Sequence, residues 1–242
     1  MVGRSPRMRT DLRLGRWQDA LAGVTCDALI FDAPYSPAGG DVERSDGYGS
    51  TGSAADYDAF TPELVREFCE SWADRTTGWW VSITDFDLAR VWRDEMRRVG
   101  RYAFREPVSC VIRAMTLRAQ GDGPSNWTLY AVVSRPRTRE LADWGVLPGS
   151  YVGGTEGHGR AGGTERSGGR GKPRWLMNAL VRDYSRIGDV VCDPFAGWGS
   201  TLAAAEANGR RAIGAESDPA AHAEAVRRLR RPLQVDMLEV LQ

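Results

Sequence analysis

The 242-residue sequence predicts an α/β fold in which helices cover both faces of a doubly wound, mostly parallel sheet. Two observations predict it. Apolar runs of strand length alternate with segments of helical periodicity along most of the chain, which is typical of strands joined by crossover helices. No internal repeat and no second apolar core interrupts the alternation. We therefore expect a single domain over residues 1–242.

The expected elements follow in chain order. Strand-length apolar runs predict strands at Cys26–Phe31, Trp79–Thr84, Val108–Ile112, Leu129–Ser134, Val190–Cys192 and Ala212–Ala215. Helical spacing predicts helices at Pro62–Ala73, Phe86–Val99, Arg174–Arg186, Thr201–Asn208 and Pro219–Leu229. Two polar, glycine-rich stretches without apolar periodicity are expected to be mobile loops, Ser36–Asp58 and Gly145–Gly171.

Composition describes an ordinary globular protein. The formal net charge is zero, so the total does not indicate nucleic acid, although six arginines within Arg90–Arg105 could contact phosphates. Solvated helix faces explain that cluster equally well. Four scattered cysteines without CxxC spacing predict reduced, buried thiols and a cytoplasmic protein, and no metal site is expected. No apolar stretch has the length of a membrane span, so no membrane partner is expected.

A glycine-rich turn follows the strand expected at Val190–Cys192. It reads Asp193-Pro-Phe-Ala-Gly-Trp-Gly-Ser-Thr201 and runs into an alanine-rich helix. Glycines there let backbone amides approach a ligand closely, and the helix N-terminus favours polar ligand groups. Glu216 ends the next strand, about 20 residues further on, where an acid can bind both hydroxyls of a ribose. The pattern predicts an adenosine-containing cofactor, and its spacing does not choose between NAD and others.

An acidic turn, Asp32-Ala33-Pro34-Tyr35, follows the first expected strand. A carboxylate and a turn carbonyl are acceptors with no proton to donate, so they suit an exocyclic amine, which has two N–H donors. The aromatic face of Tyr35 can stack on a flat base. The turn therefore predicts an amine-binding site, although an ordinary strand end explains these four residues equally well when they are read alone.

Together the motifs resemble the S-adenosylmethionine-dependent DNA amino-methyltransferases of the adenine-N6 and cytosine-N4 family, in their permuted (beta) class. The family's catalytic Asp-Pro-Pro-Tyr is matched by Asp32–Tyr35, with Ala33 replacing the first proline. Its cofactor motif, Asp-Pro-Phe-x-Gly-x-Gly-Thr, is matched by Asp193–Ser200, with serine in the last place and Thr201 following. Its Lys-Pro segment, followed by Leu-Met and a helix, is matched by Lys172–Met177. The resemblance spans about residues 11–231.

The resemblance implies a circularly permuted, Rossmann-like methyltransferase fold with a seven-stranded sheet. The catalytic half is expected at 11–135, a short target-recognition region at 136–171 and the cofactor-binding half at 172–231. In a doubly wound sheet the strands that carry the two motifs are neighbours, so their loops share one crevice whichever strand comes first. Either Thr10–Leu14 or Leu233–Val235 is expected to supply the remaining strand.

The resemblance also implies an activity, which is methyl transfer from S-adenosylmethionine to the N6 amine of an adenine flipped out of double-stranded DNA. The implied catalytic residues are Asp32, Ala33 through its carbonyl, Pro34 and Tyr35. The implied cofactor-binding residues are Asp193, Pro194, Phe195, Gly197, Gly199, Ser200, Thr201, Glu216 and Lys172.

One departure from the family affects the cofactor site. Where the family has Gly-Asp near the cofactor adenine, this chain has Gly15-Arg16-Trp17. Trp17 could stack on the adenine instead, and a core tryptophan is as plausible. A second departure is Ala33, which loosens the catalytic turn because proline restricts its predecessor as well as itself.

Target recognition is expected to involve few residues. Ser125, Asn126 and Trp127 lie in a polar loop where a flipped base would enter, although a hairpin turn is an equal alternative, and Arg135 and Arg137 could contact phosphates. The recognition region is short, which favours a brief recognition sequence, a homodimer or a partner that supplies specificity. A cognate restriction nuclease cannot be identified from the sequence.

Three functions are weighed. Asp32 at the head of the motif favours adenine-N6 methylation, because serine is more typical of the cytosine-N4 enzymes in the family. Cytosine-N4 methylation by the same fold is the first alternative. A regulatory or decoy protein that binds cofactor and DNA without catalysis is the second.

Overall fold

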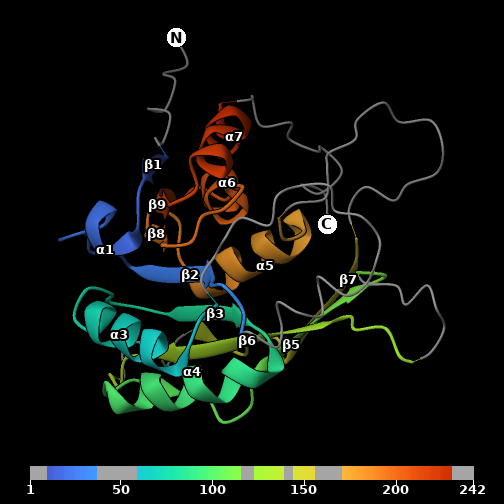
Figure 1. Ribbon diagram of the computed structural model, residues 1–242. Helices are drawn as coiled ribbons and strands as arrows, with labels where there is room; N and C mark the ends of the chain where they lie inside the picture. The colour runs from blue at the N-terminus through green and yellow to red at the C-terminus, as the bar shows by residue number, and fades with distance from the viewer. Residues whose placement is uncertain (1–9, 37–58, 116–122, 139–143, 156–170, 231–242) are drawn as a thin grey trace, which may run out of the picture.

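The computed structural model describes residues 10–36, 59–115, 123–138, 144–155 and 171–230. Its centre is a nine-stranded sheet in the order β1-β9-β8-β2-β3-β6-β5-β7, with β4 paired to β6 (Figure 1). The strands are β1 (Asp11–Leu14), β2 (Ala28–Asp32), β3 (Trp80–Thr84), β4 (Tyr102–Ala103), β5 (Val108–Arg113), β6 (Thr128–Arg135), β7 (Ser150–Gly154), β8 (Val190–Asp193) and β9 (Arg211–Glu216). The predicted α/β fold is confirmed.

The sheet is mostly parallel, as predicted. Strands β1, β9, β8, β2 and β3 run parallel to one another, β6 is antiparallel to β3 and β5, and β7 is parallel to β5. The expectation of seven strands is wrong by two. The extra strands are β4, which is only two residues long, and β7.

Strand β7 corrects the prediction of a loop across Gly145–Gly171. Ser150–Gly154 pairs with β5 at the end of the sheet. Gly153 lets the strand lie directly against the ring of Trp175, because a Cβ at that position would be only 2.4 Å from the ring. A strand so rich in glycine lacks the side-chain pattern that marks a strand in a sequence. Residues 156–170 of that expected loop, and 37–58 of the other, lie outside the described residues.

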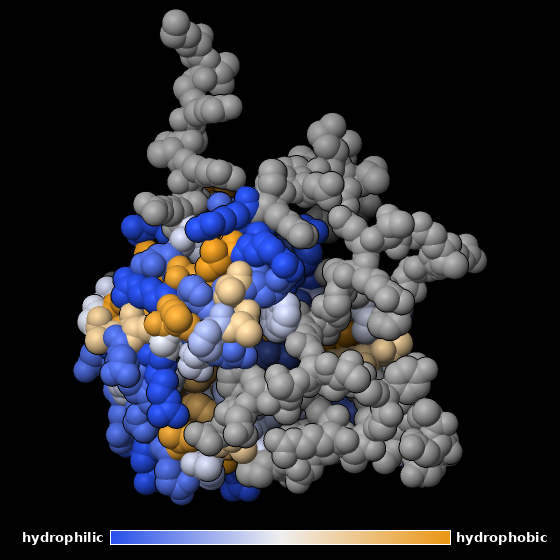
Figure 2. Space-filling view, turned by 45° about the horizontal axis from the view of Figure 1, so that its top comes forward, coloured by the Kyte–Doolittle hydropathy of each residue, from blue (hydrophilic) through white to orange (hydrophobic). Residues whose placement is uncertain are grey.

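Helices cover both faces of the sheet. They are α1 (Trp17–Ala20), α3 (Pro62–Trp72), α4 (Phe86–Arg98), α5 (Arg174–Tyr184), α6 (Ser200–Ala207) and α7 (Pro219–Leu229). Helices α3 and α4 lie on one face, and α5 and α6 lie on the other (Figure 1). Within the described ranges, no helix is long and apolar enough to cross a membrane. Where residues are described, the surface in Figure 2 is mainly hydrophilic, and small apolar patches lie among the hydrophilic residues.

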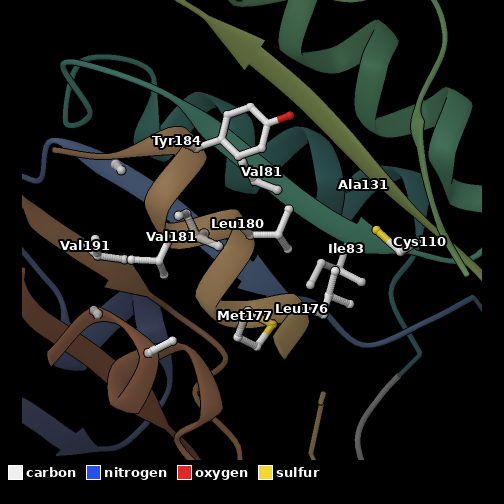
Figure 3. Close-up of a cluster of buried hydrophobic side chains, with 14 of the residues drawn as sticks. Val81, Ile83, Cys110, Ala131, Leu176, Met177, Leu180, Val181, Tyr184 and Val191 are labelled. Atoms are coloured by element: carbon white, nitrogen blue, oxygen red, sulfur yellow. The ribbon is translucent and has the colours of Figure 1, made fainter. Parts of the chain in front are cut away.

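Each face of the sheet has its own apolar cluster. On one face Leu176, Leu180 and Val181 of α5 pack against Val81 and Ile83 of β3 (Figure 3). On the other face the cluster is rich in aromatic rings, and its largest fully buried members are Phe31, Phe68, Trp72, Trp80 and Trp92. All four cysteines are buried and free, as predicted. Burial raises the pKa of the Cys110 thiol to about 12.

The strand order positions the two sequence motifs. Strand β2 pairs with β8 through Ala28 opposite Val191 and Leu29 opposite Cys192, which confirms that the two motif-bearing strands are neighbours. Because the strands are parallel, β2, β3, β8 and β9 all end at one edge, here called the carboxyl edge. Strand β1 pairs with β9, so the first of the two candidate segments supplies the additional strand. Leu233–Val235 lies outside the described residues.

Candidate active site

The turn predicted to be catalytic, Asp32–Tyr35, is called the catalytic turn below. It begins where β2 ends, at Asp32, which is opposite Ile83 of β3. The Tyr35 hydroxyl donates to Oδ1 of Asp32 at 3.3 Å. The ammonium of Lys172 donates to Oδ2 at 2.5 Å and lies 5.1 Å from the centre of the Tyr35 ring. Lys172 therefore contacts the catalytic turn, although the sequence indicated it only as a cofactor ligand.

The charge on Lys172 is stabilised by this contact. Burial disfavours an ammonium, but the Asp32 carboxylate and the Tyr35 side chain outweigh burial and raise the pKa of Lys172 above its ordinary value of 10.5. The two side chains form a partly exposed ion pair, with 19% of the lysine and 29% of the aspartate accessible. Lys172 is thus a permanent cation beside the proposed amine acceptor.

The turn is held by a main-chain group of Phe60 and by the side chain of Asp85. The N–H of Phe60 donates to the carbonyl of Tyr35 at 3.0 Å. The N–H of Ser36 donates to Oδ2 of Asp85 at 2.7 Å, and the N–H of Leu88 donates to the other oxygen of that carboxylate at 2.9 Å. Asp85 therefore caps α4 and anchors the turn at the same time. Ala33 is 2% exposed, so the position that lacks the family's proline is enclosed by packing.

The glycine-rich turn connects β8 to α6. Gly197 and Gly199 have φ values of 50° and 78°, in the left-handed region that favours glycine. Gly199 is the N-cap of α6, and a Cβ on it would lie 3.4 Å from Ala225 and Leu229 of α7. The turn therefore favours glycine at 199 for its backbone conformation, while a Cβ there would only touch α7 at van der Waals distance.

Glu216, at the end of β9, organises this turn. Its carboxylate accepts from the N–H of Gly197 at 2.7 Å and from the N–H of Asp218 at 2.7 Å. The side chain is 4% exposed. Glu216 therefore connects the end of β9 to the glycine-rich turn. The sequence pointed to Glu216 as a ligand group and missed its role in shaping the turn.

Asp193 is the last residue of β8, directly before the glycine-rich turn, and is 2% exposed. The N–H of Phe195 donates to its Oδ1 at 3.0 Å. Burial raises the pKa of Asp193 to about 7, although hydrogen bonds from Thr201 and Phe195 oppose that shift. Near neutral pH, this carboxyl group is close to balance between its protonated and ionised forms.

The remaining predicted cofactor residues lie around the same turn, with one exception. Pro194 and Thr201 are buried, and Ser200 is half-buried as the first residue of α6. The Phe195 ring is part of the aromatic cluster, 5.4 Å from Phe60 and 5.5 Å from Phe68.

Trp17 is the exception. Its side chain is 6% exposed and packs edge-on against Phe68, with the ring centres 5.1 Å apart. This burial supports the alternative of a core tryptophan over stacking on a cofactor.

The predicted DNA-contacting residues separate into two groups. Thr84 at the end of β3 is opposite Tyr130, so the segment Ser125–Trp127 before β6 reaches the carboxyl edge, and Trp127 is 37% exposed there. Arg135 is at the other end of β6. Its guanidinium donates to the carbonyls of Pro136 and Thr138, and Arg137 donates to the carbonyl of Gly100. Because β6 is antiparallel to β3, Arg135 and Arg137 lie at the opposite end of the sheet from Asp32, and their contact with phosphates stays a prediction.

The arginines of α4 favour the alternative of a solvated helix face, whereas Arg101, beyond the helix, is buried. Arg93 pairs with Asp94 at 2.8 Å, and Arg98 pairs with Glu70 at 2.8 Å. Arg101 is 4% exposed and donates to Ser134. In this part of the described chain, acidic neighbours balance much of the positive charge.

Comparisons with known proteins point to one family. Residues 161–227 match the family model of the N6/N4 "DNA methylase" sequences. No curated protein matches the chain in sequence. PvuII DNA methyltransferase, which is cytosine-N4-specific, has a similar structure with a TM-score of 0.63 at 13% identity, covering 99% of this chain and 93% of its own.

Two further structures agree. M1.HpyAVI in complex with SAM has a TM-score of 0.62 at 15% identity, covering 92% of this chain and 100% of its own. TTHA0409 of Thermus thermophilus, provisionally assigned as a DNA modification methylase, has a TM-score of 0.59 at 21% identity, covering 93% of this chain and 97% of its own. The fold of the chain and the sequence of residues 161–227 thus confirm its resemblance to the N6/N4 DNA amino-methyltransferases.

Proposed function

We propose that this protein transfers a methyl group from S-adenosylmethionine to the exocyclic N6 amine of an adenine flipped out of double-stranded DNA. One observation carries the proposal. Strands β2 and β8 are paired, so Asp32 and Asp193 end neighbouring strands at the carboxyl edge. Since the catalytic strand precedes the cofactor strand along the chain, we also assign the protein to the permuted class.

The residues of the glycine-rich turn fit the cofactor. Backbone amides at the N-terminus of α6 suit polar groups, and Glu216, which ends β9 beside the turn, would accept hydrogen bonds from the two ribose hydroxyls. Asp193 would position the methionine part of the cofactor by contacting its positively charged amino group. S-adenosylmethionine would supply a methyl group that its positive sulfur makes electrophilic. M1.HpyAVI and TTHA0409, which share the fold, have both been solved with this cofactor, which supports the proposal.

The catalytic turn fits the amine. Asp32 would accept one N–H and stabilise the positive charge that grows on the nitrogen during transfer, and the carbonyl of Ala33 would accept the other. Tyr35 would stack on the flipped base and offset part of the unstacking energy, which is a few kcal/mol. The main contribution of the protein is then to align the amine with the methyl group.

The choice of adenine over cytosine rests on the motif. Asp32 heads a sequence that is more typical of the adenine-N6 members of the family. The fold does not decide between the bases, since PvuII DNA methyltransferase has the same fold and is cytosine-N4-specific.

Mass spectrometry of nucleosides tests the function directly. DNA from cells that express the wild-type chain should contain N6-methyladenine, and DNA from cells that express Asp32→Ala should not. N4-methylcytosine in the wild-type sample would reassign the base. If neither base is methylated and the purified protein still binds S-adenosylmethionine and DNA, the non-catalytic alternative is correct. Methylation that survives in Asp32→Ala would exclude the catalytic turn.

A further inference from the structure

Lys172 is the only lysine among the 32 lysines and arginines of the chain. The two residue types are not interchangeable, because an ammonium is a compact charge with three rotatable donors and a guanidinium is a broad planar fork. The single lysine contacts Asp32, the residue that we propose accepts the target amine. Its Nζ is 2.5 Å from Oδ2 of Asp32.

The backbone places Lys172 there independently of the ion pair. Gly171 has φ of +124°, and a Cβ on it would lie 2.7 Å from Oγ of Ser200, at the start of α6. On the other side, the carbonyl of Pro173 accepts from the N–H of Met177 at 3.1 Å, in the first turn of α5. The segment therefore passes close to the cofactor turn, and its lysine reaches toward the catalytic turn.

The two oxygens of Asp32 are held unequally. Oδ2 accepts the short bond of 2.5 Å from Lys172. Oδ1 accepts from the Tyr35 hydroxyl at 3.3 Å, which is long for an O–H···O bond, whose usual length is about 2.7–2.8 Å. Oδ1 is therefore the oxygen that is less firmly engaged and can change partners at lower cost.

We infer that Lys172 is a positioning residue, whose ammonium holds Oδ2 of Asp32 so that Oδ1 is turned to accept the target amine. The inference rests on the proposed function and deepens it. It gives Lys172 a role through Asp32, in place of the role as a cofactor ligand that the sequence indicated. A positioning residue should affect the rate of transfer while the affinity for the cofactor stays the same.

Kinetics and binding test this role. Lys172→Met should leave the dissociation constant for S-adenosylmethionine, measured by calorimetry, within about threefold of wild type. The single-turnover rate of DNA methylation at saturating cofactor and DNA should fall by roughly 100-fold, which is typical of a lost catalytic hydrogen-bond contact. Arg174→Met, which removes an exposed cation two residues away, is the matched control and should leave both quantities unchanged.

Restoration of the charge gives a second test. In Lys172→Cys, alkylation with 2-bromoethylamine rebuilds an ammonium of nearly the same length, and the four native cysteines are buried. The alkylated variant should recover most of the lost rate, whereas iodoacetamide treatment should not. If Lys172→Met instead weakens cofactor binding by about tenfold or more and keeps the saturated rate, Lys172 is a cofactor ligand and the inference is wrong.

A readout without activity separates this inference from the proposed function. Labelling with ¹⁵N-lysine gives one side-chain resonance, because the chain has one lysine. Asp32→Asn should lower the pKa of Lys172, so the ammonium signal should vanish at a lower pH than in wild type. An unchanged signal would overturn the contact itself. If the wild-type chain methylates no DNA while the signal responds to Asp32→Asn, the proposed function fails and the ion pair stands.

Discussion

The main-chain N–H of Ser36 donates to Oδ2 of Asp85 at 2.7 Å and joins the end of the catalytic turn to the start of α4. The other oxygen of the same carboxylate caps that helix through the N–H of Leu88. Stability and active-site geometry therefore depend on one side chain. Suitable substitutions should separate the two effects.

Asp85→Asn should lower activity more than stability. Asparagine is as good an N-cap as aspartate, so its carbonyl oxygen can still serve Leu88. Its NH₂ group would then face the N–H of Ser36 and could not accept from it. We expect the midpoint of urea unfolding to stay close to wild type while the single-turnover methylation rate falls.

Two other variants calibrate this result. Asp85→Ala loses both bonds and should also lose about 1 kcal/mol of stability, the usual cost of an N-cap. Thr61→Ala removes the cap of α3, where Thr61 accepts from Leu64, and leaves Asp85 intact. If Thr61→Ala slows methylation as much as Asp85→Asn does, the link between Ser36 and Asp85 has no special role.

Gly199→Ala should weaken cofactor binding. The substitution places a Cβ on a residue with φ of 78° and brings it 3.4 Å from Ala225 and Leu229. Gly23→Ala is the matched control, since its φ is 70° and nothing lies within 4 Å of its Cβ. Both variants should lose about 1 kcal/mol of stability through the backbone. Only Gly199→Ala should raise the dissociation constant for S-adenosylmethionine, and equal affinities in calorimetry would contradict the assigned cofactor turn.

The fold was predictable where burial produces a clear pattern. Strands such as β3 are buried on both faces and read as apolar runs, and helices α3 and α4 have regular apolar spacing with Thr61 and Asp85 as caps. Strand β7 gave no such signal, since its pairing depends on Gly153 lying against Trp175. The two residues of β4 are too few to form a pattern.

The site was predictable in its motifs but not in the contacts between them. Asp32, Asp193 and Glu216 were proposed from the sequence because each comes at the end of an apolar run, and in the structure each is the last residue of a strand. The bond from Lys172 to Asp32 joins residues 140 positions apart, and no local pattern encodes it. The position of Arg135 could not be read from the sequence either, since the direction of β6 decides which end of the sheet its last residue reaches.

The carboxyl edge should bind DNA through Trp127 rather than through Arg137. Trp127→Ala should weaken binding to a duplex with one unpaired adenine, because stacking of a base on an aromatic ring contributes about 1–3 kcal/mol. Arg137→Ala should leave that affinity unchanged, since Arg137 donates to Gly100 at the opposite edge. Fluorescence anisotropy at fixed salt measures both. A larger loss for Arg137→Ala would move the DNA to the other edge of the sheet.

Asp193 should make the stability of the protein depend on pH. Burial raises its pKa from 3.8 to about 7, so the folded chain holds a proton that the unfolded chain has released throughout that interval. Stability therefore falls as pH rises from about 4 to 7, by roughly 4 kcal/mol for this group alone.

Asp193→Asn keeps a neutral side chain at every pH and should lack this decrease. Its free energy of unfolding, relative to wild type, should rise across the interval in urea titrations at successive pH values. Asp74→Asn, at an exposed position, controls for the change in net charge. If the difference between Asp193→Asn and wild type is the same at pH 4 and pH 7, Asp193 is not held as a buried, protonated acid.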